Sequence, residues 1–292
     1  MFVLNPARVR SAPRVAARCA AAATAAGWDW LVAETTIGDP GTGLARHAVG
    51  AGARLVVAVG GDGTVRACAH ALAGTAVPLA IVPRGTANLA ARALGLPARL
   101  DAALACAFGG HERRIDLATA DGITFVAMAG LGTDAAVVGA TPARLKTSAG
   151  WLAYAAVGAW HTRGRHADFG ISLDGTPLGV CAGSVVVGNA GLLPGGFRLL
   201  PDARLDDGQL DVAVLAPSSL PDWAVVARRV LTASRRDDRR LARYRARRVE
   251  IRADRDLPRQ VDGEVIAPGR GLTVTVLPRA LLVRVPGDWP MR

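Results

Sequence analysis

The sequence predicts an α/β chain with an N-terminal parallel-sheet domain and a C-terminal domain of mostly antiparallel strands. Over the first ~125 residues, short apolar runs alternate with helical patterns, which is typical of a parallel sheet covered on both faces. After about residue 115 the alternation stops and one strand pattern follows another. We therefore expect a domain at 1–120 and a second at 121–292, with the extreme C-terminus allowed to pack back on the first.

Within the first domain, apolar runs and the alternating segment Trp28–Glu34 predict strands, and Ala-rich stretches bounded by Gly or Pro predict helices. The predicted strands are Phe2–Leu4, Trp28–Glu34, Leu55–Val59 and Leu79–Val82. The predicted helices are Ser11–Ala26, Gly43–Gly52, Val65–Ala73, Ala87–Leu94 and Leu100–Phe108.

In the second domain, β-branched runs predict strands and the dipeptide Asp174-Gly175 predicts a hairpin turn. The predicted strands are Ile123–Ala129, Asp168–Leu173, Leu178–Val187, Gln209–Leu215, Arg247–Ala253, Leu272–Leu277 and Leu281–Val285. Two helices are predicted, Ala143–Trp160 and Pro221–Leu231, and the second is allowed to extend through Arg245. The apolar residues of Ala143–Trp160 fit either an acyl-chain pocket or a core-packing helix.

The most informative segment is Gly60-Gly61-Asp62-Gly63-Thr64, directly after the strand Leu55–Val59. Its glycines allow the backbone to approach a polyphosphate closely, and the following helix would point its N–H groups at the same anion. Asp62 can orient a divalent cation, and Thr64 can bond an oxyanion. The alternative is a Gly-rich strand-to-helix turn in which Asp62 caps the helix.

A second loop, Pro83-Arg84-Gly85-Thr86-Ala87-Asn88, repeats the order of strand, glycine, hydroxyl and helix. Gly-Thr before a helix is by itself a common cap. Because ligands of parallel sheets bind beyond the carboxyl ends of the strands, the two loops together predict two walls of a nucleotide site. Arg84 is a candidate partner for a phosphate.

Composition indicates a globular chain without a membrane span. The hydrophobic fraction is 51%, but no apolar stretch approaches the ~18 residues of a spanning helix. The N-terminus lacks the basic and apolar regions of a signal peptide. The four cysteines show no C-x-x-C spacing, and we expect buried thiols in a reducing cytoplasm.

The net charge is +11, and 34 of the 35 basic residues are arginine. An excess of positive charge favours anionic partners such as nucleotides, nucleic acids or acidic membranes. The stretch Ala227–Arg252 contains 11 arginines. It fits either an anionic lipid surface or a solvated helical face.

Together with Asn5-Pro6, Asp207-Gly208 and Asp262-Gly263-Glu264, the two glycine loops resemble the diacylglycerol kinase catalytic family of lipid kinases, which includes sphingosine kinases and soluble bacterial lipid kinases. The resemblance covers nearly the whole chain. It implies a Rossmann-like first domain, similar to NAD kinases and phosphofructokinases, and a β-sandwich second domain that carries the lipid substrate.

The resemblance also implies site residues. The residues it implies as nucleotide contacts are Asn5, Thr36, Gly60, Gly61, Asp62, Gly63, Thr64 and Thr86. Glu264 matches the proton acceptor of the family, and Asp62 is expected to organise Mg²⁺ on the phosphates. Asp207 and the carbonyls of Arg204 and Gln209 match a structural Mg²⁺ site. Leu89 departs from the family, which often has an acidic residue there.

The resemblance therefore implies an ATP- and Mg²⁺-dependent lipid kinase, cytoplasmic and peripherally bound to an anionic membrane. The acceptor would be the hydroxyl of a diacylglycerol-like or sphingoid lipid. An NAD kinase-like phosphotransferase and an Arg-rich nucleic-acid-binding protein are the alternatives. No nucleic-acid module is recognisable, so we expect no nucleic-acid partner. A homodimer is left open.

Overall fold

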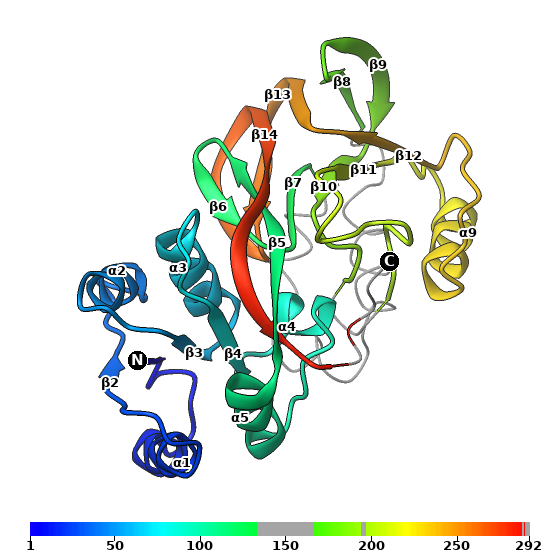
Figure 1. Cartoon of the computed structure of the whole chain (residues 1–292). Helices are drawn as coiled ribbons and strands as arrows, with labels where there is room; N and C mark the ends of the chain where they lie inside the picture. Colours follow the sequence, from blue (N-terminus) through cyan, green and yellow to red (C-terminus); the bar gives the residue numbers. More distant parts are fainter. Residues whose placement is uncertain (133–165, 194–196, 288, 290–292) are drawn as a thin grey trace. The chain divides into compact units, whose positions relative to one another are not determined.

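The computed structural model of the chain describes residues 1–132, 166–193, 197–287 and 289 (Figure 1). The chain divides into two compact units. Unit 1 comprises Met1–Ile115 with Arg279–Arg292, and unit 2 comprises Asp116–Pro278. The predicted helix Ala143–Trp160 lies outside the described residues.

Unit 1 is built on a parallel sheet whose strands follow the order β4-β3-β1-β2. The strands are β1 (Phe2–Leu4), β2 (Val32–Glu34), β3 (Val56–Gly60) and β4 (Leu79–Pro83). Every residue of β1, β3 and β4 is buried, which agrees with the all-apolar runs of a sheet covered on both faces.

Helices cover this sheet. They are α1 (Ala12–Ala25), α2 (Thr42–Gly50), α3 (Asp62–Leu72), α4 (Leu89–Ala93) and α5 (Leu100–Gly109). Residues of α1 and α5 share one apolar core cluster with Val57 and Val59 of β3, while α3 packs against β3 and β4. The helix-strand alternation predicted for this part of the chain is confirmed.

Unit 2 contains an antiparallel sheet in the order β12-β11-β10-β7-β13-β14. Its strands are β7 (Met128–Gly132), β10 (Ser184–Gly188), β11 (Leu210–Leu215), β12 (Leu241–Ala246), β13 (Arg248–Val261) and β14 (Glu264–Val285). The last residues of β14, from Arg279 on, belong to unit 1 and pair there with β4. A hairpin of β8 (Ala167–Leu173) and β9 (Thr176–Ala182) pairs with β13. Asp174 and Gly175 turn it with φ of 50° and 90°, as the sequence predicts.

Alternate side chains of the unit 2 sheet enter two different cores. Val185 and Val187 of β10 belong to a cluster that includes residues of β8, β13 and β14. Val186 points the other way, into a cluster with Val226 and Val230 of the helix α9 (Leu220–Leu231). This alternation is the period-two pattern of a sheet buried on both faces.

Several predicted strand limits need correction. The strand β5 (His111–Ala120) was not predicted, because its first four residues, His111–Arg114, are polar or charged and give no apolar run. The predicted strand Ile123–Ala129 is two strands, β6 (Ile123–Phe125) and β7. The predicted strand Leu178–Val187 is divided between β9 and β10, and the last two predicted strands are parts of the single strand β14.

The extension of the last helix through Arg245 is wrong. Helix α9 ends at Leu231, and Ala233 takes a left-handed φ of 49°, which ends the helical geometry. The residues Leu241–Ala246 instead pair with β11 as β12. Among the described residues, no helix is long and apolar enough to cross a membrane.

Candidate functional site

The candidate nucleotide residues of unit 1 follow four neighbouring strands. Thr86 follows β4, Gly60–Thr64 begins at the end of β3, Asn5 follows β1 and Thr36 follows β2. Since β4, β3, β1 and β2 are adjacent and parallel, their carboxyl ends lie at the same edge of the sheet. This edge is where open α/β sheets bind ligands.

The first glycine loop is shaped by Thr64. A Cβ on Gly60 would lie 2.7 Å from the Thr64 Oγ1, so any other residue would collide with that side chain. Thr64 is 2% exposed, and its Oγ1 accepts a hydrogen bond of 3.1 Å from Asn5 Nδ2. The residue after β1 and the loop after β3 are thus joined directly.

The two glycine loops touch through their backbones. A Cβ on Gly85 would lie 2.6 Å from the Gly61 Cα, and a Cβ on Gly61 would lie 3.1 Å from the Gly85 Cα. The Arg84 N–H also donates to the Gly60 carbonyl at 2.7 Å. Only glycine permits this approach, which explains why both segments carry it.

Asn88 closes the second loop. Its Oδ1 accepts from the Gly85 N–H at 2.8 Å, and its Nδ2 donates to the Gly85 carbonyl at 2.9 Å. Asn88 adopts a left-handed φ of 48°, a conformation that asparagine tolerates better than most residues. This role of Asn88 was not predicted from the sequence, although asparagine one position before a helix is a recognised turn signal.

Asp62 is the first residue of α3, where the N-terminal N–H groups favour a negative charge. Its Oδ1 accepts a hydrogen bond of 3.4 Å from the N–H of Ala90, in the first turn of α4. The carboxylate of Asp62, the only one in the glycine loop, therefore lies between the starts of two helices. Leu89, which precedes Ala90 in α4, is 3% exposed.

The loop after β2 is organised by Asp39. The carboxylate accepts backbone hydrogen bonds from Gly41, Gly43 and Leu44 at 2.9 to 3.0 Å. Partial burial opposes ionisation, but these backbone donors outweigh it and lower the pKa of Asp39. Thr36 is exposed, and its Oγ1 accepts from the Asp39 N–H, whereas the adjacent Thr35 is buried.

Arg84 has a buried donor at the same edge. Its Nε is buried and makes no hydrogen bond within the described part of the chain. Burial raises the pKa of the Cys19 thiol in α1 to about 11, and the positive charge of Arg84 acts in the opposite direction. An unpaired guanidinium donor is costly unless a ligand bonds to it.

The candidate cation residues lie in unit 2, before β11. The Asp207 Oδ1 accepts from the Gln209 N–H at 3.1 Å, and its Oδ2 forms an ion pair with Arg245. Asp211 is 5% exposed, and its Oδ2 makes no hydrogen bond within the described residues. Burial raises the pKa of Asp211 to about 6 despite the nearby charge of Arg245.

These carboxylates fit a hard cation. One or two carboxylates with backbone carbonyls and water are a donor set that suits Mg²⁺. In the described ranges, no group of three or more His, Cys, Asp or Glu is arranged so that it could hold a metal ion through side chains alone. Asp116, which is fully buried, orders the segment by accepting the Gly208 N–H at 2.6 Å.

Glu264 and Asp262 have different environments although they belong to one hairpin. Asp262 is 7% exposed, and its two oxygens accept the N–H groups of Val126, Ala127 and Met128 at 2.8 to 3.1 Å. Both carboxylate oxygens of Asp262 are therefore bonded to backbone N–H groups, and Asp262 anchors the hairpin. Glu264 is exposed, opposite Val261 at the start of β14.

Comparison with known families identifies both parts of the chain. Residues 1–120 match the diacylglycerol kinase catalytic domain, and residues 127–285 match the YegS C-terminal NAD kinase beta sandwich-like domain. A Pseudomonas fluorescens protein named Probable lipid kinase YegS-like is 36% identical over 91% of this chain and 89% of its own length. A Bacillus subtilis diacylglycerol kinase is 31% identical over 82% of this chain and 80% of its own.

Solved structures agree on the fold. A Bacillus anthracis structure assigned as a diacylglycerol kinase superposes with a TM-score of 0.84 at 22% identity, covering 99% of this chain and 95% of that one. An NAD kinase from Archaeoglobus fulgidus in complex with ATP superposes with a TM-score of 0.54 at 12% identity, covering 98% of this chain and 94% of that one. These likenesses confirm the predicted fold class, an NAD kinase-like α/β part with a C-terminal β-sandwich.

Proposed function

Because this chain belongs to the diacylglycerol kinase catalytic family of lipid kinases, we propose that it transfers the γ-phosphate of ATP to the hydroxyl of a diacylglycerol-like or sphingoid lipid. Family membership makes it a phosphotransferase with an alcohol group as acceptor. The choice of acceptor lipid, the metal dependence and the residue roles are our proposal.

The observation that carries the proposal is the row of candidate nucleotide contacts along one edge of the parallel sheet. Thr86, Gly60–Thr64, Asn5 and Thr36 follow four adjacent strands. The amide groups of the glycine loops would hold the phosphates, and the start of α3 favours their negative charge. The unpaired Arg84 Nε supplies a further donor for an anion.

We assign the catalytic roles to Asp62 and Glu264. Phosphoryl transfer needs charge neutralisation, positioning and a group that takes the proton of the attacking hydroxyl. The carboxylate of Asp62 would hold the nucleotide-bound Mg²⁺, which when present neutralises charge on the phosphates. Glu264 would accept the hydroxyl proton, whereas Asp262 is committed to three backbone N–H groups.

We also propose a structural Mg²⁺ site at Asp207 with the carbonyls of Arg204 and Gln209. The buried and unpaired Oδ2 of Asp211 supports a cation nearby, because an unpaired buried carboxylate oxygen is unfavourable. Arg245 would have to leave Asp207 for the cation to bind.

We propose a cytoplasmic location with peripheral attachment to an anionic membrane. The support is the chemistry of the substrates, since ATP is a cytoplasmic nucleotide and the lipid acceptor resides in a bilayer. All four cysteines are free, but only Cys19 and Cys68 are buried, so the expectation of buried thiols is wrong for the half-buried Cys106 and the exposed Cys181. NAD phosphorylation is the alternative that the fold alone allows, and we propose no nucleic-acid partner.

The test is transfer of labelled phosphate from ATP to dioctanoylglycerol or sphingosine in detergent, with Mg²⁺. Glu264→Gln should lower kcat by about 10²–10⁴-fold and leave ATP affinity near wild type, since it removes a general base and keeps size and polarity. Asp62→Asn should lower kcat by at least ~100-fold. Wild-type turnover by both variants would contradict the assigned roles.

A further inference from the structure

Asn189 is a fully buried polar side chain in unit 2. It follows directly after the strand β10 and is 0% exposed. Its Nδ2 donates to the carbonyls of Asp116 and Val126 at 2.9 and 3.0 Å, whereas its Oδ1 makes no hydrogen bond within the described residues. Since burial of an amide is unfavourable without hydrogen bonds, the two donated bonds offset the cost of placing this side chain here.

Asn189 holds the bend at residues 126–128, between β6 and the start of β7. The N–H groups of Asn189 and Ala190 both donate to the Ala127 carbonyl at 2.9 Å. The three N–H groups of the bend donate to the Asp262 carboxylate, and the Asp262 N–H donates to the Met128 carbonyl at 2.8 Å. Every N–H and carbonyl of the bend is therefore bonded to Asn189, Ala190 or Asp262.

Asp262 connects this bend to the hairpin that carries Glu264. Asp262 and Gly263 form the turn between β13 and β14 with φ of 48° and 80°, and Glu264 is the first residue of β14. The Gly263 N–H also donates at 2.9 Å to the Oε1 of Gln260, which is 2% exposed. Because both turn residues are held, a displacement of the bend at 126–128 would move the backbone of Glu264 with it.

Asn189 is also joined to the segment of the proposed cation ligands, through Asp116. The Asp116 N–H donates to the Leu205 carbonyl at 2.6 Å, and the Asp116 Oδ2 accepts from the Gly208 N–H at 2.6 Å. Leu205 and Gly208 alternate along the chain with the proposed ligands. A continuous path of hydrogen bonds therefore runs from this segment through Asp116 and Asn189 to Asp262.

We propose that Asn189 is a positioning residue, which ties the Glu264 hairpin to the segment of the proposed cation ligands and so fixes where the Glu264 carboxylate lies. Loss of a central member of a buried network leaves its partners unpaired, and the network must shift to bond them again. A displacement of about 1 Å at a reacting group can cost roughly 100-fold in rate. The inference rests on the proposed function only for the role of Glu264 as the base.

The first test is a double-mutant cycle of Asn189→Leu and Glu264→Gln, assayed with ATP, Mg²⁺ and dioctanoylglycerol in detergent. Leucine keeps the branched shape of asparagine but has no donor for the carbonyls of Asp116 and Val126. Asn189→Leu alone should lower kcat at least ~10-fold and leave the KM for ATP near wild type. In the Glu264→Gln background it should lower kcat by less than about two-fold, because the base is already absent.

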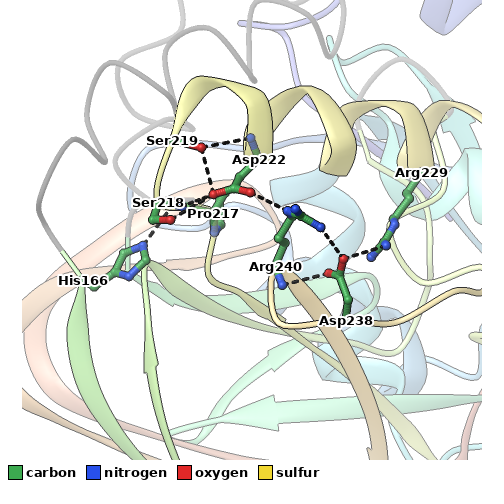
Figure 2. Close-up of polar contacts among 8 residues, drawn as sticks. All are labelled: His166, Pro217, Ser218, Ser219, Asp222, Arg229, Asp238 and Arg240. Carbon is green, nitrogen blue, oxygen red and sulfur yellow. Dashed lines mark hydrogen bonds and ion pairs between the residues drawn. The ribbon is translucent and has the colours of Figure 1, made fainter.

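The control for lost stability is a second polar cluster of unit 2, at the start of α9 (Figure 2). Its members bond to one another through their side chains: Ser218, Ser219, Asp222, Arg229, Asp238 and Arg240. Burial opposes ionisation of Asp238, but its bonds to Arg229 and Arg240 outweigh this effect and lower its pKa to about 2. Both arginines belong to the arginine-rich stretch after Ala227, and aspartates neutralise them.

This cluster joins α9 to the segment before β12, and three strands, β11, β10 and β7, separate β12 from β13 in the sheet. Asp222→Ala removes the acceptor of Arg240 and of two hydroxyl groups. Its melting temperature should fall by roughly 2–10 °C, as should that of Asn189→Leu, while its kcat stays within about two-fold of wild type.

The second test needs neither enzyme activity nor the catalytic role of Glu264. Amide hydrogen exchange is followed by NMR in the wild type and in Asn189→Ser, which keeps one donor, with and without Mg²⁺. In the wild type, Mg²⁺ should slow exchange both at Gly208 and at residues 126–128, because the path joins them. In Asn189→Ser the slowing should remain at Gly208 and be lost at residues 126–128.

Three results would overturn the inference. Equal fold-losses of kcat from Asn189→Leu in both backgrounds would show that Asn189 only stabilises the fold; if this variant does not fold, Asn189→Ser takes its place in the cycle. An equal loss of kcat in Asp222→Ala would mean that kcat follows stability. Slowing at residues 126–128 that persists in Asn189→Ser would remove Asn189 from the path. A wild type that phosphorylates no lipid would contradict the proposed function instead, and the exchange experiment would still decide the role of Asn189.

Discussion

The close contact between Gly61 and Gly85 predicts that a side chain at residue 85 destabilises unit 1, and the interatomic distances give the size of the effect. In Gly85→Ala, the new Cβ would lie 2.6 Å from the Gly61 Cα and 2.9 Å from the Asn88 Oδ1. Ordinary contacts of a Cβ begin near 3.4 Å, so the backbone of one loop must move by almost 1 Å. The neighbour that must yield is backbone, and no side-chain rotation relieves the overlap.

Overpacking of this kind costs about 1–3 kcal/mol. For a chain of this size the expected fall in melting temperature is roughly 2–10 °C. Because the displaced loops carry the proposed phosphate contacts, ATP affinity should fall as well. The control is Gly50→Ala at the end of α2, where a new Cβ meets nothing within 4 Å and should be neutral or slightly stabilising.

Differential scanning calorimetry and titration of ATP measure both effects. A Gly85→Ala variant with the melting temperature and the ATP affinity of the wild type would refute this prediction. It is also refuted if Gly50→Ala is as destabilising, because the effect would then not depend on the contact between the loops.

Three further predictions concern unit 2. Asp262→Ala should destabilise the fold by about 3 kcal/mol or more in urea unfolding, because three buried N–H groups lose their charged acceptor; a loss of activity with unchanged stability would contradict this. Mg²⁺ should raise the melting temperature, Asp207→Ala should abolish that rise and Arg245→Gln should increase it, since Arg245 competes for Asp207; equal rises in all three proteins would place the cation elsewhere. The depressed pKa values of Asp222 and Asp238 mean that the unfolded chain binds more protons below about pH 4, so stability present at neutral pH is lost on acidification; Asp222→Asn should therefore show a flatter melting temperature between pH 5 and 3, and a parallel curve would contradict it.

Local sequence patterns were sufficient to predict most of the strands and helices of unit 1. Buried parallel strands read as uninterrupted apolar runs, and the glycine loops follow them directly in sequence. The strand β5 was missed because its first four residues, His111–Arg114, are polar or charged and give no apolar signal. The helical extension to Arg245 failed because arginines favour helices locally, whereas pairing with β11 decided the conformation of Leu241–Ala246.

The parts of the candidate site that sequence could not supply depend on distant partners. Asp262 reads as a hairpin residue, and only the fold brings it to the backbone of Val126, more than 130 positions away. Asp116 likewise binds Gly208 across 92 positions. The arginine-rich stretch shows the same limit, because its composition could not reveal which side chains were already neutralised by aspartates.

The most direct test of the central claim is a competition between acceptors in one reaction. The purified chain is incubated with γ-labelled ATP, Mg²⁺, an extracted bacterial lipid mixture and NAD, and the labelled products are separated. The account predicts label in a phosphorylated lipid, with the yield strongly reduced in Glu264→Gln. Label in NADP with none in any lipid would contradict it.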